Sequence, residues 1–137
     1  MRLGLFRGLG ICAALVAAAA PAAAHHSFSA EYDSKKPVTL AGIVTKVDWM
    51  NPHVYFYMDV TDEKSNIVNW AFEMGPPGLL AKNGWTRNTM KVGDEVTVEG
   101  TLAKDGTNQA NARSVTMTNT GKKLGAGSSE LANQSGQ

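Results

Sequence analysis

The chain has 137 residues, with 13 basic and 12 acidic side chains, and 43% of its residues are hydrophobic. This length is enough for one domain, and the near balance of charge excludes the strongly basic composition that is typical of nucleic-acid-binding proteins. The one cysteine is Cys12, so the chain after it offers no thiolate ligand and no disulfide.

Residues 1–24 have the composition of a cleavable export signal. Two arginines precede an alanine-rich apolar run, and small residues stand at positions −3 and −1 of a cut after Ala24. The apolar run is shorter than the ~20 residues that a membrane-spanning helix needs, which argues against a retained anchor. We therefore expect a periplasmic or secreted protein that begins at His25 and has no membrane segment. Its net charge would be close to −1, because 11 basic residues then face 12 acidic ones.

The mature chain is expected to consist of a polar arm over residues 25–37, a folded domain over residues 38–119 and a tail. Phe28 and Tyr32 are the arm's only large anchors, and a proline at its end marks the entry to the first strand. That strand covers residues 38–49. A glycine near its middle predicts a bulge or a sharp bend.

Two further strands follow, in which apolar and polar residues alternate. Residues 54–60 place apolar side chains at every second position, and residues 67–74 show the same period. A G-P-P-G stretch ends the third strand, because proline cannot continue a ladder. Residues 79–83 are expected to form a short helix that ends at Gly84.

Two more strands complete the domain, over residues 95–103, with Leu102 among the inward side chains, and over residues 112–118. Residues 120–137 have few apolar side chains and no period, which predicts a disordered tail. Five strands with one short helix between the third and the fourth predict an all-β fold, a small OB-like Greek-key barrel. Another small barrel or sandwich remains open, because periodicity does not determine strand pairing.

Five motifs occur in order along the mature chain: HHSFSAEYDSKKPVTLAG, VDWMNPH, NWAFEMGPP, GWTRNTMKVGDEVTVEG and AKDGTNQANARSV. With these motifs the chain resembles a family of small exported bacterial proteins, domain of unknown function 6152, from about His25 to Val115. The resemblance implies export and a small β-fold, and it implies no reaction.

His25 would be the first residue after the cut. A free N-terminal histidine offers its α-amine and its ring Nδ1 to one ion, and both groups lose protons readily near neutral pH when a metal competes. Such a nitrogen set suits Cu(II), and a second imidazole from His53 or His26 would complete the site. A cut after Ala22 would leave an amine, two amides and one imidazole, which also suit Cu(II) or Ni(II). The alternative is that the two N-terminal histidines are solvated polar residues without a metal.

His53 starts the second predicted strand, at a rim of the barrel. Its ring is expected either to bind the metal or to cap the turn that precedes it. Glu73 ends the third predicted strand. It either orients an imidazole, supplies an oxygen ligand or is a solvated charge at the rim.

Trp49, Tyr55 and Tyr57 are expected on an outward, partly open face. They form either a ligand-binding platform, like those on which OB barrels stack bases, or ordinary cross-strand packing. Export and neutral charge argue against nucleic acid as the ligand.

No motif for a nucleophile, a zinc protease or a phosphate-binding loop is found, so we do not expect an enzyme, with copper-dependent oxidative activity as the one alternative. The sequence predicts an exported binding protein for Cu(II). The alternative is an interaction module that binds another exported protein or a small molecule without a metal.

Overall fold

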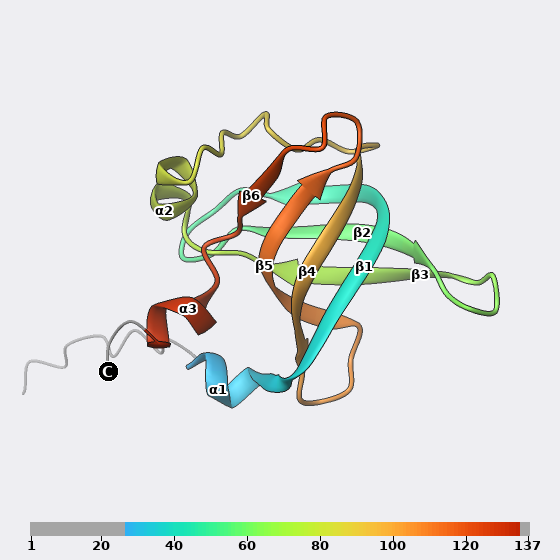
Figure 1. Cartoon of the computed structure of the whole chain (residues 1–137), viewed down its shortest axis with the longest axis horizontal. Helices are drawn as coiled ribbons and strands as arrows, with labels where there is room; N and C mark the ends of the chain where they lie inside the picture. Colours follow the sequence, from blue (N-terminus) through green and yellow to red (C-terminus); the bar gives the residue numbers. More distant parts are fainter. Residues whose placement is uncertain (1–26, 135–137) are drawn as a thin grey trace, which may run out of the picture.

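The computed structural model describes residues 27–134, and the predicted signal, His25 and His26 lie outside that range. The strands are β1 Tyr32–Asp48, β2 Tyr55–Thr61, β3 Ile67–Glu73, β4 Glu95–Ala103, β5 Gln109–Met117 and β6 Lys123–Gly125. The helices are α1 Phe28–Glu31, α2 Pro77–Lys82 and α3 Ser129–Gln134. The all-β prediction is confirmed (Figure 1). Within residues 27–134 no helix has the length and apolar character needed to cross a membrane.

The six strands form one sheet in the order β3-β2-β1-β4-β5-β6, and a further pairing between β3 and β5 closes it into a ring. The long strand β1 makes this possible, because its first half pairs with β4 and its last part with β2. The closing pair is parallel and joins Ala71–Glu73 to Gln109–Asn111. The helix α2 follows β3, as predicted, and Gly84 lies just past its end at φ +90°.

Gly42 lies where β1 passes from one partner strand to the other. Its neighbour Ile43 pairs with both Glu95 of β4 and Asp59 of β2. A Cβ atom at Gly42 would collide with the carbonyl oxygen of Asp59, so a side chain there would push β2 away. The glycine in the first strand therefore permits a close approach at the bend, as its position in the sequence suggested.

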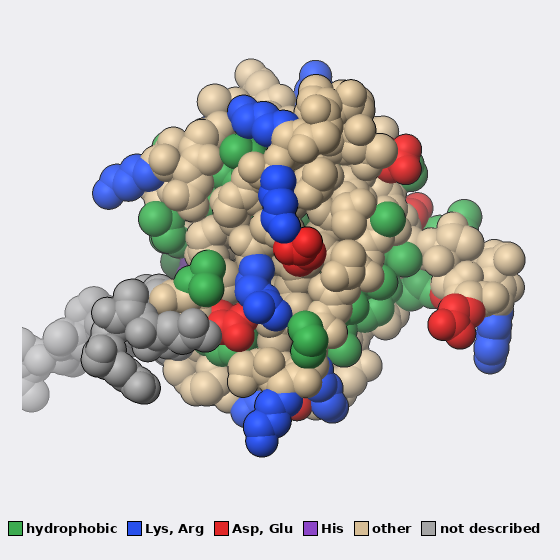
Figure 2. Space-filling model, in the orientation of Figure 1, with side chains coloured by type: hydrophobic (Ala, Val, Ile, Leu, Met, Phe, Trp, Pro, Cys, Tyr) green, Lys and Arg blue, Asp and Glu red, His purple; other side chains and the backbone are tan. Residues whose placement is uncertain are grey.

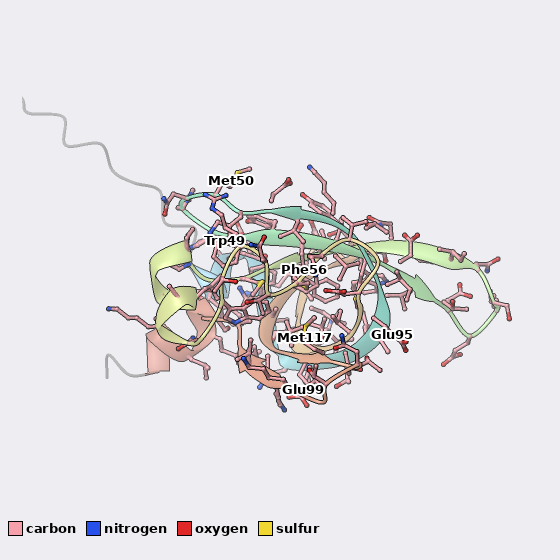
Figure 3. All side chains as sticks on the ribbon, turned by 90° about the horizontal axis from the view of Figure 1, so that it is seen from above. Trp49, Met50, Phe56, Glu95, Glu99 and Met117 are labelled. Atoms are coloured by element: carbon pink, nitrogen blue, oxygen red, sulfur yellow. The ribbon has the colours of Figure 1, made fainter. Side chains whose placement is uncertain are left out.

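The core fills the ring with side chains from every second position of its strands. In β2 and the residue before it, Val54, Phe56, Met58 and Val60 are all buried, as predicted. The rings of Phe56 and Phe72 stack with centroids 5.0 Å apart. Figure 3 looks into the ring, with Phe56 and Met117 toward its middle and Glu95 and Glu99 at its periphery.

The predicted inward position of Leu102 agrees with the register of β4. Leu102 lies opposite Ala110 of β5, and Ala110 lies opposite Phe72 of β3, and both of these partners are in the core. Leu102 itself is half-buried. Thr101 and Ala103 lie on the other face of β4, and they are buried because residues of α3 and α1 cover that face.

The predicted polar arm is part of the fold from Phe28 onward. It contains α1 and the start of β1, rather than ending where the first strand was expected at residue 38. Phe28 and Tyr32 are buried, as anchors should be, and their rings stack with centroids 5.5 Å apart.

The prediction of a disordered tail is wrong for residues 123–134, which we call the C-terminal strap. Leu124 and Ala126 are buried, and the indole of Trp85 donates a hydrogen bond of 2.8 Å to the carbonyl of Gly125. The strap comes so close to Gly75 that a Cβ atom on Gly75 would collide with the carbonyl of Gly127. Small residues gave this segment a low apolar content, and the same small residues allow its backbone to pack.

Candidate functional site

Three neighbouring strands present one row of polar side chains at the same level of the sheet. The register of β2, β3 and β5 places Tyr55 opposite Glu73, and Glu73 opposite Asn111. In β2 and β3 the core residues occupy the alternate positions, so Tyr55 and Glu73 lie on the outer face of the ring. Side chains directly opposite on adjacent strands lie close enough to interact.

Glu73 is the centre of this row. Its Oε2 accepts hydrogen bonds from the phenol of Tyr55 at 2.7 Å and from the phenol of Tyr32 at 3.0 Å. Its Oε1 accepts a hydrogen bond from the side-chain amide of Asn111 at 3.3 Å. The Nδ1 atom of His53 lies 3.4 Å from the same Oε1. Four side chains therefore meet at the carboxylate group of Glu73.

The two ends of the described chain cover this row. Tyr32 comes from the N-terminal arm, and Asn111 contacts Ser128 and Ser129 of the strap. The helices α1 and α3 contact each other and lie at the same end of the ring (Figure 1). As a result Glu73 is only 5% exposed although it points away from the core of the ring. The interpretation of Glu73 as a solvated rim charge is wrong.

His53 is held beside Glu73 by the backbone. The N–H of Met74 donates to the carbonyl oxygen of Val54, and the N–H of Val54 donates to the carbonyl oxygen of Gly75, so the β2–β3 pairing continues beyond its last paired residues. His53 lies two residues before Tyr55 and so on the same outer face. Its side chain is 24% exposed, which leaves part of the ring accessible to a ligand.

The environment of Glu73 affects both phenols. Burial, followed by the negative charge of Glu73, raises the pKa of Tyr32 well above its ordinary value. Burial also raises the pKa of Tyr55, followed by its hydrogen bond to Glu73. Both phenols therefore keep their protons and act as donors to the carboxylate at any ordinary pH.

The remaining predicted ligand-binding residues are not brought to Glu73. Trp49 is partly buried and packs against the core, while Met50 lies at the outer turn that follows (Figure 3). Tyr57 lies opposite Ala71, and the ammonium group of Lys46 lies 5.2 Å from the centroid of its ring. Only Tyr55 of the three predicted aromatic residues belongs to the site.

A metal ion at His53 would need ligands from outside the described residues. Within residues 27–134 no group of three or more His, Cys, Asp and Glu side chains is arranged to hold a metal. His25 and His26, the other predicted nitrogen ligands, lie outside this range.

Sequence reasoning missed Asn111 and Gln109, and it treated Tyr32 only as an anchor. Gln109 donates a hydrogen bond of 2.9 Å to the phenol oxygen of Tyr32. Both missed residues lie in the segment N-Q-A-N, which looked like a loop before the fifth predicted strand. The alternation of amide and small side chains that begins at Gln109 was the signal that this strand starts earlier.

A model described as a family of unknown function, DUF6152, matches residues 13–112 of the chain. Tyr32, His53, Tyr55, Glu73 and Asn111 all fall within the matched range, whereas the C-terminal strap lies beyond it. Comparisons with curated proteins and with solved structures gave no match.

Proposed function

The chain belongs to the family of unknown function DUF6152, and from the geometry at Glu73 we propose that it is an exported protein that binds Cu(II) between His53 and a mature N-terminal His25. The ligands would be the α-amine and the imidazole of His25 together with the imidazole of His53. His26 would be a further nitrogen ligand. The role would be storage, delivery or tolerance of copper.

The observation that carries this proposal is that one carboxylate holds both the arm and His53. Tyr32 of the arm donates to Oε2 of Glu73, and His53 contacts Oε1 of the same group. Phe28, also in the arm, is buried against Tyr32. Because three residues of extended chain span at most about 10 Å, we expect His25 within that distance of the buried Phe28, which supports a site shared with His53.

Nitrogen ligands favour copper over the other common divalent ions. Cu(II) has the highest affinity of the first-row divalent metals for such sites, and it accepts a planar nitrogen set. A chelate formed by an amine and an imidazole on one residue needs no pre-formed cage. A strand-anchored imidazole such as that of His53 supplies the fixed position against which a tethered chelate closes.

Export and the OB-like character of the ring are part of the proposal. Export is supported by the basic start, apolar run and small residues of positions 1–24. The OB-like interpretation is supported by strand pairing in the order 1-2-3-5-4-1 and by a helix between β3 and β4.

The test has two steps. Mass spectrometry of the protein recovered after export is expected to identify His25 as the first residue. Cu(II) is then titrated into this material and into His25→Ala, His53→Ala and the double variant. If both histidines bind one ion, each single variant loses affinity and the double variant loses less than the sum of the two. No loss on His53→Ala would contradict a shared site.

A second candidate function is favoured by a pocket next to the site. It has a volume of about 500 Å³ and is lined by Ala30, Glu31, Tyr55, Ala103, Lys104, Asp105 and Gln109. Its polar lining suits a small polar molecule, and Tyr55 connects it to Glu73. In this case the protein is a non-catalytic binding module. This candidate would be supported by NMR shifts at Tyr55 and Gln109 on addition of a small polar molecule, together with a Cu(II) affinity that His53→Ala leaves unchanged.

A further inference from the structure

We propose that Glu73 is a positioning residue rather than a copper ligand. It holds the neutral ring of His53 as the Nδ1–H tautomer, so that Nε2 is the nitrogen offered to an ion. The identity of the ion rests on the proposed function. The tautomer is a property of the metal-free protein and is testable without copper.

The hydrogen-bonding capacity of the Glu73 carboxylate is already used. A carboxylate has two oxygens and about four lone-pair sites. Tyr32 and Tyr55 take the two sites on Oε2, while Asn111 and His53 face Oε1. A metal on either oxygen would have to displace one of these donors inside a site that is 95% buried. An oxygen ligand from Glu73 is therefore disfavoured.

The geometry at Oε1 determines which ring nitrogen carries the proton. The Nδ1 atom of His53 lies 3.4 Å from Oε1, and a carboxylate oxygen only accepts hydrogen bonds, so a proton on Nδ1 is favoured over a lone pair there. In a neutral imidazole the other nitrogen is then an acceptor. Metal-binding histidines commonly use this arrangement, in which a carboxylate fixes the tautomer and orients the ring.

The partners of Glu73 are themselves held, so the carboxylate cannot easily turn away. Gln109 donates to the phenol oxygen of Tyr32 at 2.9 Å, which directs the hydroxyl proton of Tyr32 to Glu73. The carbonyl oxygen of the Asn111 side chain accepts a hydrogen bond from Ser128, which directs its amide NH₂ group to Glu73. These contacts fix the position of the Glu73 carboxylate, and the carboxylate in turn favours one tautomer of His53.

The substitution Glu73→Gln makes a specific prediction. The two phenols of Tyr32 and Tyr55 need an acceptor, so they retain the amide oxygen of glutamine on their side. The NH₂ group of glutamine then faces His53 and the side-chain amide of Asn111, which keeps the hydroxyl of Ser129 as an acceptor. Nδ1 becomes an acceptor, and the ring proton moves to Nε2, which blocks the nitrogen that would bind a metal.

The experiment is long-range ¹H–¹⁵N NMR of the histidine ring in the metal-free mature protein, at a pH where the ring is neutral. The wild-type protein is expected to show a protonated Nδ1 and an unprotonated Nε2. Glu73→Gln is expected to show the reverse. The control variant Glu95→Gln removes an exposed carboxylate and is expected to show the wild-type pattern. A protonated Nε2 in the wild-type protein would overturn the proposal, even if Glu73→Gln fails to fold.

Copper titration separates this inference from the proposed function. If both hold, Glu73→Gln loses about 10- to 100-fold in Cu(II) affinity while Glu95→Gln does not change. If wild type and Glu73→Gln bind Cu(II) equally, the positioning role is wrong and the proposed function stands. If no variant binds Cu(II) but wild-type Nδ1 is protonated, the proposed function is wrong and the tautomer assignment stands.

Discussion

Burying the carboxylate of Glu73 costs free energy of folding unless each of its four polar neighbours is in place. Charged groups are removed from water only when their hydrogen bonds are replaced, and each missing partner exposes the full cost of desolvation. Glu73 meets this condition through one residue each from β2, β5, the arm and the turn before β2. Single substitutions around it are therefore informative about the network.

Tyr32→Phe is expected to lower the free energy of unfolding by about 1.5–3 kcal/mol, because it removes a donor to a charged acceptor and leaves the ring in place. The matched control is Tyr57→Phe, whose hydroxyl makes no hydrogen bond with the described residues and whose loss should cost less than about 0.5 kcal/mol. Urea denaturation measures both. Equal effects of the two variants would contradict the network.

The raised pKa values of Tyr32 and Tyr55 predict a loss of stability at alkaline pH. In the unfolded chain a phenol ionises near pH 10, whereas these two keep their protons beyond that pH in the folded protein. Their contribution to stability is therefore complete below about pH 10 and falls as the pH rises further, toward the folded pKa values.

Tyrosinate absorbance followed beside circular dichroism measures this effect. Ionisation of these two phenols is expected to coincide with unfolding, and Tyr32→Phe and Tyr55→Phe should each remove one late-ionising group. Ionisation of both near pH 10 in a protein that stays folded would contradict the environment described for Glu73.

The C-terminal strap is the element whose packing differs most from what its composition predicted. It contributes Leu124 to the core, receives the indole hydrogen bond of Trp85, and places Glu130 at 3.1 Å from Thr101 and 3.4 Å from Arg113. Figure 2 shows Lys and Arg side chains along the visible face, with some Asp and Glu side chains among them. The strap is thus held by apolar and polar contacts together.

Leu124→Ala is expected to cost about 2–5 kcal/mol in unfolding free energy, because it removes a buried side chain and leaves a cavity. Leu131→Ala is the matched control, since Leu131 in α3 is 52% exposed, and its cost should be below about 0.5 kcal/mol. Thermal or urea unfolding compares them. If the strap were disordered, neither substitution would change the free energy of unfolding.

The irregular pairing of β4 with β5 next to Gly100 leads to a second prediction at the level of the elements. A Cβ atom at Gly100 would lie 2.5 Å from the carbonyl oxygen of Asn111, the residue that donates to Glu73. Gly100→Ala should therefore cost about 1–3 kcal/mol. Gly78→Ala in α2, where a Cβ atom meets no described atom within 4 Å, should be neutral or stabilise by up to about 1 kcal/mol. The reverse order in urea unfolding would contradict this account of β4.

The strands were predictable because apolar and polar side chains alternate along them. The bounds predicted for β4 are those that the structure has. The extra residue of β5 beside Glu99 and Gly100 was not predicted, because a one-residue irregularity has no signature in the period of a single strand. His53 and Glu73 were both selected from the sequence. Their contact could not be predicted, because it depends on β2–β3 register and on coverage by two segments that looked polar.

At the scale of the whole molecule, both ends of the described chain converge on one end of a closed sheet. The arm reaches Glu73 through Tyr32, and the strap reaches it through Asn111. Closure of the ring by β3 and β5 brings Glu73 and Asn111 together, although they are 38 positions apart in the chain. The fold thus holds the side chain of His53 and the arm residue Tyr32 at the same carboxylate.

The most direct test of the central claim counts the imidazoles on one bound copper ion. Pulsed EPR of the mature protein with one equivalent of Cu(II) detects the remote nitrogen of each coordinated imidazole ring. The account predicts two imidazoles in the wild-type protein and one in His53→Ala. A single imidazole in both proteins would show that His53 does not share an ion with the N-terminus and would contradict the account.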